Sequence, residues 1–468
     1  MSDKSIERHA GPITWGMFLV LVLVAIFIAA GFLATPLALL ALLVAFVCTF
    51  RCTYPVFYIG VALTPFLGLI VSIPTGRLLL GERAFGGSID ISVAEVVLCF
   101  VLLAWTIKLF VQWFRRHDDE WRLRLPLFGS YFALVAAHVA SIFSPLLPDP
   151  ILVVKFALRP VLFNYLAFIV LPVNLIRSRR RLITVLGIVS AVGVFAAATG
   201  FISIFFPPGG SFIGRAHPIP LFGVSALGEN HNELAELLVW TSLVTIALAC
   251  LVSDARWRRF LYGAAAFQTC IVLFTFTRTG WIVLAAEAVV LFAAVWRDRI
   301  TRHLRTLVII GLFLLPLAGA MTAYSISESA SSSTSTRLML SAIAWNLFLS
   351  SPWFGAGAGS FLERVGATRI FLQEYGAPLD SHGIFQKIGA ETGVLGLLAL
   401  SAVALQFLLL IRRTLPRMSS PSSRMCFLTL ATGAGGAFLY QMFNTAYWTG
   451  TMWLPIGLVL VAAYVLVD

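Results

Sequence analysis

The sequence has few charged residues. Only 12% of its 468 residues are Asp, Glu, Lys or Arg, whereas 59% are hydrophobic. Ordinary globular chains have roughly 25% charged and about 45–50% apolar residues. So few charges cannot solvate the surface of a soluble enzyme, whereas a surface that faces lipid requires apolar side chains. The composition therefore excludes a soluble enzyme and indicates an integral membrane protein.

Cysteine and nucleotide-binding motifs are also scarce. The six cysteines have neither the spacing of a disulfide framework nor that of a C-x-x-C metal site. The sequence GAGAGS at 355–360 departs from G-x-G-x-x-G at its last residue, and no G-x-x-x-x-G-K-[ST] occurs. The acids of the predicted outer loops form no D-x-D pair. Any reaction must therefore draw its energy from an already activated substrate.

Long apolar runs fill most of the chain, and crossing a bilayer takes about 20 apolar helical residues. The run after the mixed-charge N-terminus is too long for a signal-peptide core, so we interpret it as a retained first span. The second run is short, as in a re-entrant segment or half of a broken pair. The sequence predicts an all-α, polytopic membrane protein with 12 to 14 transmembrane helices. The candidate runs are 15–34, 36–50, 54–72, 92–114, 126–146, 151–175, 182–206, 232–252, 260–277, 280–296, 306–323, 384–411, 426–443 and 450–467.

Basic residues are concentrated in the connections on one side of the predicted membrane. These positions hold 22 of the 33 lysines and arginines: Lys4, Arg8, Arg51, 115–124, 177–181, 256–259, 297–305 and 412–424. The positive-inside rule makes that side cytoplasmic, together with both termini. The net charge of +12 is therefore read as a signal of topology, and no nucleic-acid partner is expected.

Two long segments lie on the opposite side, which the rule makes periplasmic. Segment 207–231 is rich in Pro and Gly, which predicts irregular backbone. Segment 324–383 opens with a Ser/Thr run that we expect to be flexible. It continues with an amphipathic stretch at 337–350 and a second short helix within 361–376. A loop of this length is usually functional.

The chain therefore divides into three parts. Residues 1–323 contain the first eleven spans, with a periplasmic loop near 207–231. Residues 324–383 form the long, partly helical periplasmic loop, and residues 384–468 contain the last three spans.

Cations outside the cytoplasmic connections indicate an anion site. Arg215 lies in the first long loop and Arg278 in a tight turn between two spans. A guanidinium binds two oxygens at once, which suits a diphosphate, although interfacial snorkelling explains a single arginine as well. Lys155 and Arg159 are four residues apart within a span, so they share a helix face and repel each other unless an anion lies between them. We expect these four side chains to bind a diphosphate.

The tetrapeptide DSHG at 380–383 lies where the long loop returns to the membrane. His382 can act as a neutral base near pH 7, and the alternative is that it caps the following helix. Glu391 lies inside the next span, where an acid needs a partner. It is a site candidate or a buried acid bonded to a neighbouring helix. Asn232 and His217 are further candidates, with ordinary cap or loop structure as the alternative.

The two segments RLMLSAIAWNLFLSSPWFGAGAGSF and SHGIFQKIGAETGVLGLLAL resemble the signature of the O-antigen ligase and polymerase superfamily. That signature has an Arg, a Trp, a Pro-x-x-Gly-x-Gly turn, His-Asn and Glu-x-Gly-x-x-Gly. The corresponding positions are Arg337, Trp345, Pro352, Gly355, Gly357, His382, Glu391, Gly393 and Gly396. Gly383 replaces the usual Asn, so no role of that Asn carries over. The resemblance extends from about residue 151 to residue 411.

The resemblance implies a GT-C-like glycosyltransferase of the bacterial inner membrane with a periplasmic active site. Such an enzyme transfers a glycan from undecaprenyl diphosphate to an acceptor hydroxyl, which belongs to the lipid A core for a ligase and to another lipid-linked repeat for a polymerase. It needs no nucleotide sugar, and the ligases need no metal. On this basis His382 is the base of an inverting displacement, and Arg215, Arg278, Lys155 and Arg159 stabilise the departing diphosphate. The supporting residues are Arg337, Glu391, Asn232, His217 and Asp380.

Several alternatives remain open. The loop centred on His382 favours a ligase, with an exopolysaccharide or capsule polymerase close behind, and a protein O-glycosylation enzyme uses the same donor. A flippase moves such a lipid without chemistry. It would hold its cations in a central cavity and has no need of a long outer loop that ends in a histidine. The expected partners are the lipid-linked donor, a glycan acceptor and the bilayer.

Overall fold

The structure is a computed structural model, and it confirms the all-α prediction. It describes residues 36–74, 88–114, 123–206, 214–220, 223–228, 230–294, 330–366, 368, 379–445 and 447–467. Most of these residues are helical. The predicted spans at 15–34 and 306–323 lie outside the described residues.

The helices follow the chain in this order. In the first half they are α2 (Pro36–Arg51), α3 (Thr53–Leu63), α5 (Val93–Phe114), α6 (Phe128–Ala140), the 3-10 turn η3 (Ser141–Phe143), α7 (Pro150–Phe156), α8 (Leu171–Leu175) and α9 (Arg179–Ser203). In the second half they are α10 (His231–Leu251), α11 (Ala255–Phe274), a helix at 278–294, α13 (Ala330–Ser350), α14 (Phe361–Gly366), α16 (Ile384–Thr414), the 3-10 turn η6 (Leu415–Arg417), α17 (Pro421–Tyr440) and α18 (Gly450–Val465).

One small sheet was not predicted. Strands β1 (Ile70–Pro74) and β2 (Ser88–Ser92) pair antiparallel, with Ile70 opposite Ser92. The predicted span at 54–72 is therefore wrong in its second half, because α3 ends at Leu63 and the chain turns into β1. α2 and α3 are bent by 110° at a short break, which makes them a broken span or a re-entrant loop.

Several helices are suited to cross a membrane. Within the described residues, five helices are long and apolar enough, or six if the bent pair α2 and α3 is one span. The segments Phe128–Phe143 and Gly450–Val465 are shorter apolar helices. The chain is therefore a multi-pass membrane protein. The predicted total of 12 to 14 spans includes runs outside the described residues.

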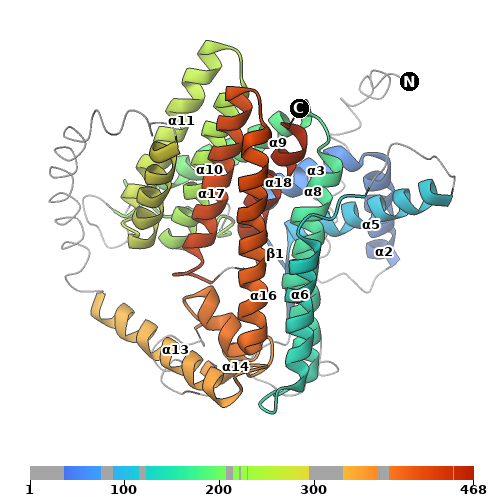
Figure 1. Ribbon diagram of the computed structural model, residues 1–468, viewed down its shortest axis with the longest axis vertical. Helices are drawn as coiled ribbons and strands as arrows, with labels where there is room; N and C mark the ends of the chain where they lie inside the picture. The colour runs from blue at the N-terminus through green and yellow to red at the C-terminus, as the bar shows by residue number, and fades with distance from the viewer. Residues whose placement is uncertain are drawn as a thin grey trace.

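α10 is the centre of the bundle, with α9, α11 and α17 packed around it (Figure 1). A buried polar cluster joins three of these helices. Gln268 of α11 donates to Thr245 (2.9 Å) and accepts from Thr241 (2.8 Å) on α10. Gly193 of α9 leaves room for this cluster, because a Cβ there would lie 2.6 Å from Gln268 Oε1. Small residues and hydrogen bonds between helices hold such bundles together in lipid.

The segment between α7 and α8 is π-helical, as η4 (Ala157–Phe163) and η5 (Tyr165–Val170). Pro160 explains the change, since its ring would clash with the carbonyl one turn earlier and it has no N–H to donate. Asn164 Nδ2 donates to the carbonyls of Pro160 (2.8 Å) and Trp448 (2.9 Å). This bond ties the π-helical segment to the start of α18.

The predicted long loop contains α13 and α14. α13 begins at Ala330, so the Ser/Thr run that we expected to be flexible is helical from that residue onward. α13 crosses the foot of the bundle obliquely, whereas α16 runs along the bundle (Figure 1). Leu340 and Ala344 of α13 form a small core with Phe361 of α14 and Ala390 of α16.

The two ends of the bundle differ in charge. α10, α16 and the helix at 278–294 begin at one end, where α17 also ends, and we name this end the site face. The opposite end carries the arginines at the starts of α9 and α11 and at the end of α16: Arg179, Arg180, Arg181, Arg256, Arg258, Arg259, Arg412 and Arg413.

Candidate active site

A series of hydrogen bonds joins five separate segments at the site face. The bonds are Ala216 N to Phe274 O (2.9 Å), Thr277 Oγ1 to His231 O (3.5 Å), Tyr440 OH to Asn232 O (2.8 Å) and Ile384 N to Gln441 O (2.9 Å). The first bond holds Ala216, the neighbour of Arg215, and the second holds Thr277, the neighbour of Arg278. The fourth bond holds Ile384, which follows the turn that carries His382. The structure thus gathers Arg215, Arg278 and His382 at one end of the bundle.

The turn that carries His382 is fixed by its neighbours. Ser381 Oγ donates to Gly383 O (2.9 Å), and the Thr445 hydroxyl donates to the Ser381 carbonyl. Gly383 packs so closely on the α17–α18 connection that a Cβ there would lie 3.0 Å from Met442 O. A side chain at position 383 would therefore crowd the Met442 carbonyl.

Asp380, before the histidine, is held by a buried lysine. Lys387 Nζ donates to both Asp380 carboxylate oxygens (2.8 and 2.6 Å) and lies 3.9 Å from Glu391. The side chains of Lys387 and Glu391 are only 3% and 1% exposed. The Lys387 ammonium also lies 4.2 Å from the centre of the Trp448 ring. Asp380 is thereby fixed to the first turn of α16.

Sequence reasoning counted Lys387 only among the cations of the outer side and named no partner for it, although an intramembrane Lys four residues before an intramembrane Glu is a recognisable signal. It did predict that Glu391 needs a partner. The structure supplies Lys387 and a second contact, because Glu391 Oε1 accepts from the backbone N–H of Phe361 (3.2 Å) at the start of α14. Glu391 therefore joins α16 to α14, which agrees with the alternative of a buried acid bonded to a neighbouring helix.

The glycines of the two signature segments interlock. The backbone N–H of Ala356 donates to Ala390 O (2.7 Å) and that of Gly357 to Glu391 O (3.0 Å). Gly393, with φ 64°, interrupts α16 with a kink. A Cβ at Gly393 would lie 2.5 Å from Pro352 O. The Pro-x-x-Gly-x-Gly turn thus packs against the kinked start of α16 and fixes the helix that follows His382.

A single methyl group at this contact should be destabilising. Gly355 has φ +65°, and a Cβ there would lie 2.3 Å from Glu391 C. We expect Gly355→Ala to lower the free energy of unfolding by about 2–4 kcal/mol, from the left-handed backbone and the forced backbone shift. The measurement is thermal or denaturant unfolding of the purified protein in detergent.

Gly435→Ala is the matched control, because that glycine is helical and nothing lies within 4 Å of the added Cβ. It should be neutral or stabilising by up to about 1 kcal/mol. Equal effects of the two substitutions would contradict the interlocking of the two glycine segments.

Arg337 on α13 is close enough to His382 and Arg278 to affect them electrostatically. Burial lowers the pKa of His382, and the Arg337 charge lowers it further, while Asp380 acts in the opposite direction. Burial and the Arg278 charge likewise lower the pKa of Arg337. Two arginines and a histidine therefore converge at the site face, and the histidine is favoured in its neutral form at pH 7.

In the part of the chain that the structure describes, no acid forms a salt bridge with the arginines of the site face. Among the described residues, the salt bridges join Arg159 to Glu95 and Lys387 to Asp380 and Glu391, and none includes Arg215, Arg278 or Arg337. The Nε of Arg337 is buried without a hydrogen-bond partner in the described part of the chain. Unpaired guanidinium groups at one site favour an anionic ligand.

Arg215 and His217 lie in the described part of the first long loop. Arg215 is exposed. His217 is held by the end of α9 and by its own loop, since its backbone N–H donates to Ser203 Oγ (2.9 Å) and its Nδ1 lies 3.0 Å from Arg215 O. His217 therefore shapes the backbone that presents Arg215.

The polar residues at the start of α10 have two roles: one caps the helix, and another is a buried acid that contacts α17. Asn230 is the N-cap and accepts from the N–H groups of Asn232 (2.9 Å) and Glu233 (3.1 Å). Asn232 contributes its backbone carbonyl to the contact with α17. Glu236 is buried and accepts from Gln441 (2.8 Å) and Asn444 (2.7 Å). These bonds hold the ends of α10 and α17 together beside the site.

We expected Lys155 and Arg159 to bind a diphosphate together, but the structure pairs Arg159 with an acid. Arg159 donates to Glu95 at 3.0 Å, so its charge already has an acidic partner at the start of α5. Lys155 is half-buried on α7, next to Phe156, whose ring contacts the glycine turn at Gly359.

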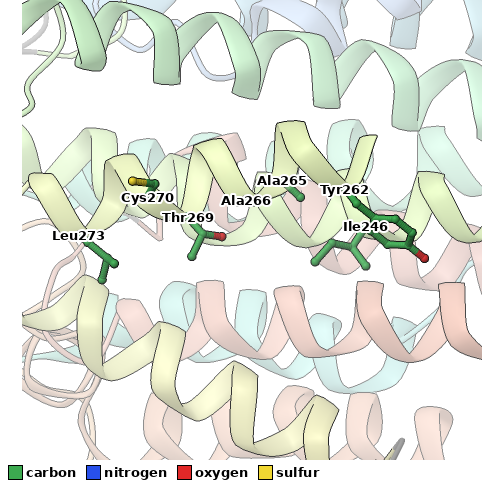
Figure 2. Close-up of a pocket in the computed structure, with 7 residues that line it drawn as sticks. All are labelled: Ile246, Tyr262, Ala265, Ala266, Thr269, Cys270 and Leu273. Carbon is green, nitrogen blue, oxygen red and sulfur yellow. The ribbon is translucent and has the colours of Figure 1, made fainter. Parts of the chain in front are cut away.

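The cavity shown in Figure 2 is a different feature. It has a volume of about 390 Å³, and its lining is almost wholly apolar. The lining residues are Ile246, Tyr262, Ala265, Ala266, Thr269, Cys270 and Leu273. It lies along α10 and α11 and contains none of the candidate site residues. Within the described residues, no three His, Cys, Asp or Glu side chains are grouped so as to hold a metal ion.

Comparison with known proteins supports the resemblance. Residues 263–401, a little under a third of the chain, match the family model described as O-Antigen ligase. No curated protein matches the chain. A solved structure described as "Structural coordination of polymerization and crosslinking by a peptidoglycan synthase complex" is 17% identical, with a TM-score of 0.41, and the match covers 72% of this chain and 96% of that one. The segment that carries Arg278, Arg337, His382 and Glu391 therefore lies within the match to the O-antigen ligase family, which supports the resemblance to the O-antigen ligase and polymerase superfamily.

Proposed function

We propose that this chain transfers a glycan from undecaprenyl diphosphate to an acceptor hydroxyl at the periplasmic face of the bacterial inner membrane. The observation that carries the proposal is the convergence of His382 with Arg278 and Arg337, whose guanidinium groups have no acidic partner among the described residues. A neutral base beside unpaired cations suits an acceptor hydroxyl and an anionic leaving group. The family match supports a membrane glycosyltransferase.

The proposed step is a single displacement. The acceptor oxygen forms a bond with the anomeric carbon and gives its proton to the imidazole of His382. The bond between that carbon and the diphosphate oxygen breaks on the opposite face, so the anomeric centre is inverted. Arg278, Arg337 and Arg215 stabilise the negative charge that develops on the departing lipid diphosphate. The carboxylate of Asp380, bonded to Lys387, holds the turn that presents the base.

We propose O-antigen ligation to the lipid A core as the specific activity. In a flippase, cations are expected along a central path. Here Arg215, Arg278 and Arg337 lie at the site face, and the arginines that begin α9 and α11 and end α16 lie at the opposite end. The positive-inside rule makes that opposite end cytoplasmic, which supports a periplasmic site. The polymerase alternative uses the same donor and differs in the acceptor.

Reconstitution tests the reaction and the acceptor together. Purified protein in liposomes receives a glycan on undecaprenyl diphosphate, with lipid A core or without it. We expect glycan on the core only when both substrates are present. Longer glycan on the lipid carrier, formed without the core, would show a polymerase. Movement of the donor across the bilayer without any transfer would contradict the proposal and indicate a flippase.

A further inference from the structure

α13 has one buried face and one exposed apolar face, which no described residue covers. Leu340 and Ala344 are buried against α14 and α16. On the other side, Leu338, Ala342, Trp345 and Leu349 are exposed at spacings of four, three and four residues, and we name these four residues the α13 stripe. Leu338 is 67% exposed and Trp345 is 59% exposed. Spacing of this kind places all four side chains on one side of the helix.

The position of α13 relative to the membrane follows from α16. The part of α16 after the kink, residues 394–414, is about 30 Å long at a rise of about 1.5 Å per residue, which matches a hydrocarbon core of about 30 Å. Its far end carries Arg412 and Arg413. The kink at Gly393 therefore lies near the opposite edge of the hydrocarbon core.

α13 packs against α16 at this level. Ala390, three residues before the kink, is part of the core that α13 shares with α14 and α16. Ser341 Oγ of α13 accepts from Gln386 Nε2 at 2.9 Å. α13 therefore lies at the boundary between hydrocarbon and water on the site face, and it crosses the bundle axis obliquely there (Figure 1).

The exposed surface beside α13 is also of the kind that faces lipid. The span of α16 exposes Leu398, Leu405 and Leu408. Near the glycine turn, Phe143 is 73% exposed and stacks edge-on with Phe354, and Trp353 is exposed as well. Aromatic side chains are enriched at membrane–water boundaries. The apolar surface of the span thus meets a group of exposed aromatic residues at the level of α13.

We propose that the α13 stripe lies in the lipid leaflet at the site face, with Trp345 and Leu349 among the head groups and upper acyl chains. An amphipathic helix binds a membrane surface in this orientation through its apolar face. Leu338 belongs to the stripe and directly follows Arg337. Contact with lipid therefore holds Arg337 over the site. The lipid contact of α13 is independent of the transfer reaction.

Site-specific photo-crosslinking identifies what covers the stripe. Benzoylphenylalanine is placed singly at Trp345, at Ser350 and at Leu408, and each protein is irradiated in nanodiscs of phosphatidylethanolamine and phosphatidylglycerol. Leu408 is the lipid-facing reference. Ser350 is the matched control, because it is exposed on the flank of the same helix, about 100° from Leu349. We expect at least about fivefold more lipid adduct at position 345 than at position 350, close to the yield at 408.

Two results would overturn the proposal. One is a lipid yield at position 345 no higher than at 350 while position 408 reacts normally. The other is a crosslink from position 345 to a second protein chain, which would make the stripe a protein interface. Size-exclusion profiles and melting temperatures that match the unsubstituted protein confirm that each labelled protein is folded. The adduct is read by mass spectrometry, so a failed transfer assay leaves this result interpretable.

Discussion

His382→Ala should lower the rate of glycan transfer by about 10²- to 10⁴-fold, the range that a positioned general base supplies. The turn around His382 is held by Ser381, Thr445 and the Asp380–Lys387 pair, and within the described residues no hydrogen bond of the imidazole contributes to it. The substitution should therefore leave folding unchanged. The measurement is single-turnover transfer from a lipid-diphosphate glycan, together with the melting temperature.

Chemical rescue separates a base from a structural residue. Imidazole added to His382→Ala should restore part of the rate and should have no effect on Gly355→Ala, whose defect lies in the fold. Retention of most activity by His382→Ala would remove the base from the mechanism. Loss of activity together with a large fall in the melting temperature would indicate a structural role instead.

The pH profile adds a second readout of the same base. Burial and Arg337 lower the pKa of His382 from its ordinary value of about 6.5. The neutral imidazole is the active form, so kcat/KM should fall on acidification with a midpoint below about pH 6.5. Arg337→Gln removes a positive charge, raises the pKa of His382 and should move that midpoint to higher pH. A midpoint that does not move would contradict the proximity of Arg337 to the base.

Much of the transmembrane framework could be predicted from the sequence, because hydrophobic runs of membrane-crossing length have few alternatives. α5, α9, α10 and the helix at 278–294 agree closely with predicted runs. The β1–β2 hairpin escaped prediction because Ile70 and its neighbours continue an apolar run, and hydropathy alone does not separate a strand from a helix end. The helical start of α13 escaped it because a Ser/Thr run has no apolar period.

The candidate site was predictable in its chemistry but not in its geometry. His382, Arg278 and Arg337 are unusual residue types for their places in the chain, which a single sequence shows. The hydrogen bonds that gather them join residues dozens to more than 200 positions apart, such as Tyr440 and Asn232. No local pattern encodes such contacts. The partner of Arg159 was missed for the same reason, since Glu95 lies 64 residues away.

Arg278→Gln should lower kcat/KM by about 150-fold, which corresponds to about 3 kcal/mol of lost electrostatic stabilisation. Arg278 opens the helix at 278–294 and is exposed at the site face, where no acid among the described residues neutralises it. A glutamine keeps hydrogen-bonding capacity and removes the charge. Arg256→Gln, an exposed arginine at the start of α11 on the opposite end, is the matched control and should keep the full rate.

A change of the glycan donor tests whether the charge of Arg278 acts on the diphosphate. With a glycan carried on a lipid monophosphate, wild type and Arg278→Gln should differ far less, because the second phosphate is missing. Arg278 and Arg337 interact electrostatically, so if both act on one anion the double substitution should cost less than the sum of the two single effects. Equal losses with both donors, or strictly additive losses, would mean that Arg278 acts elsewhere than on the leaving diphosphate.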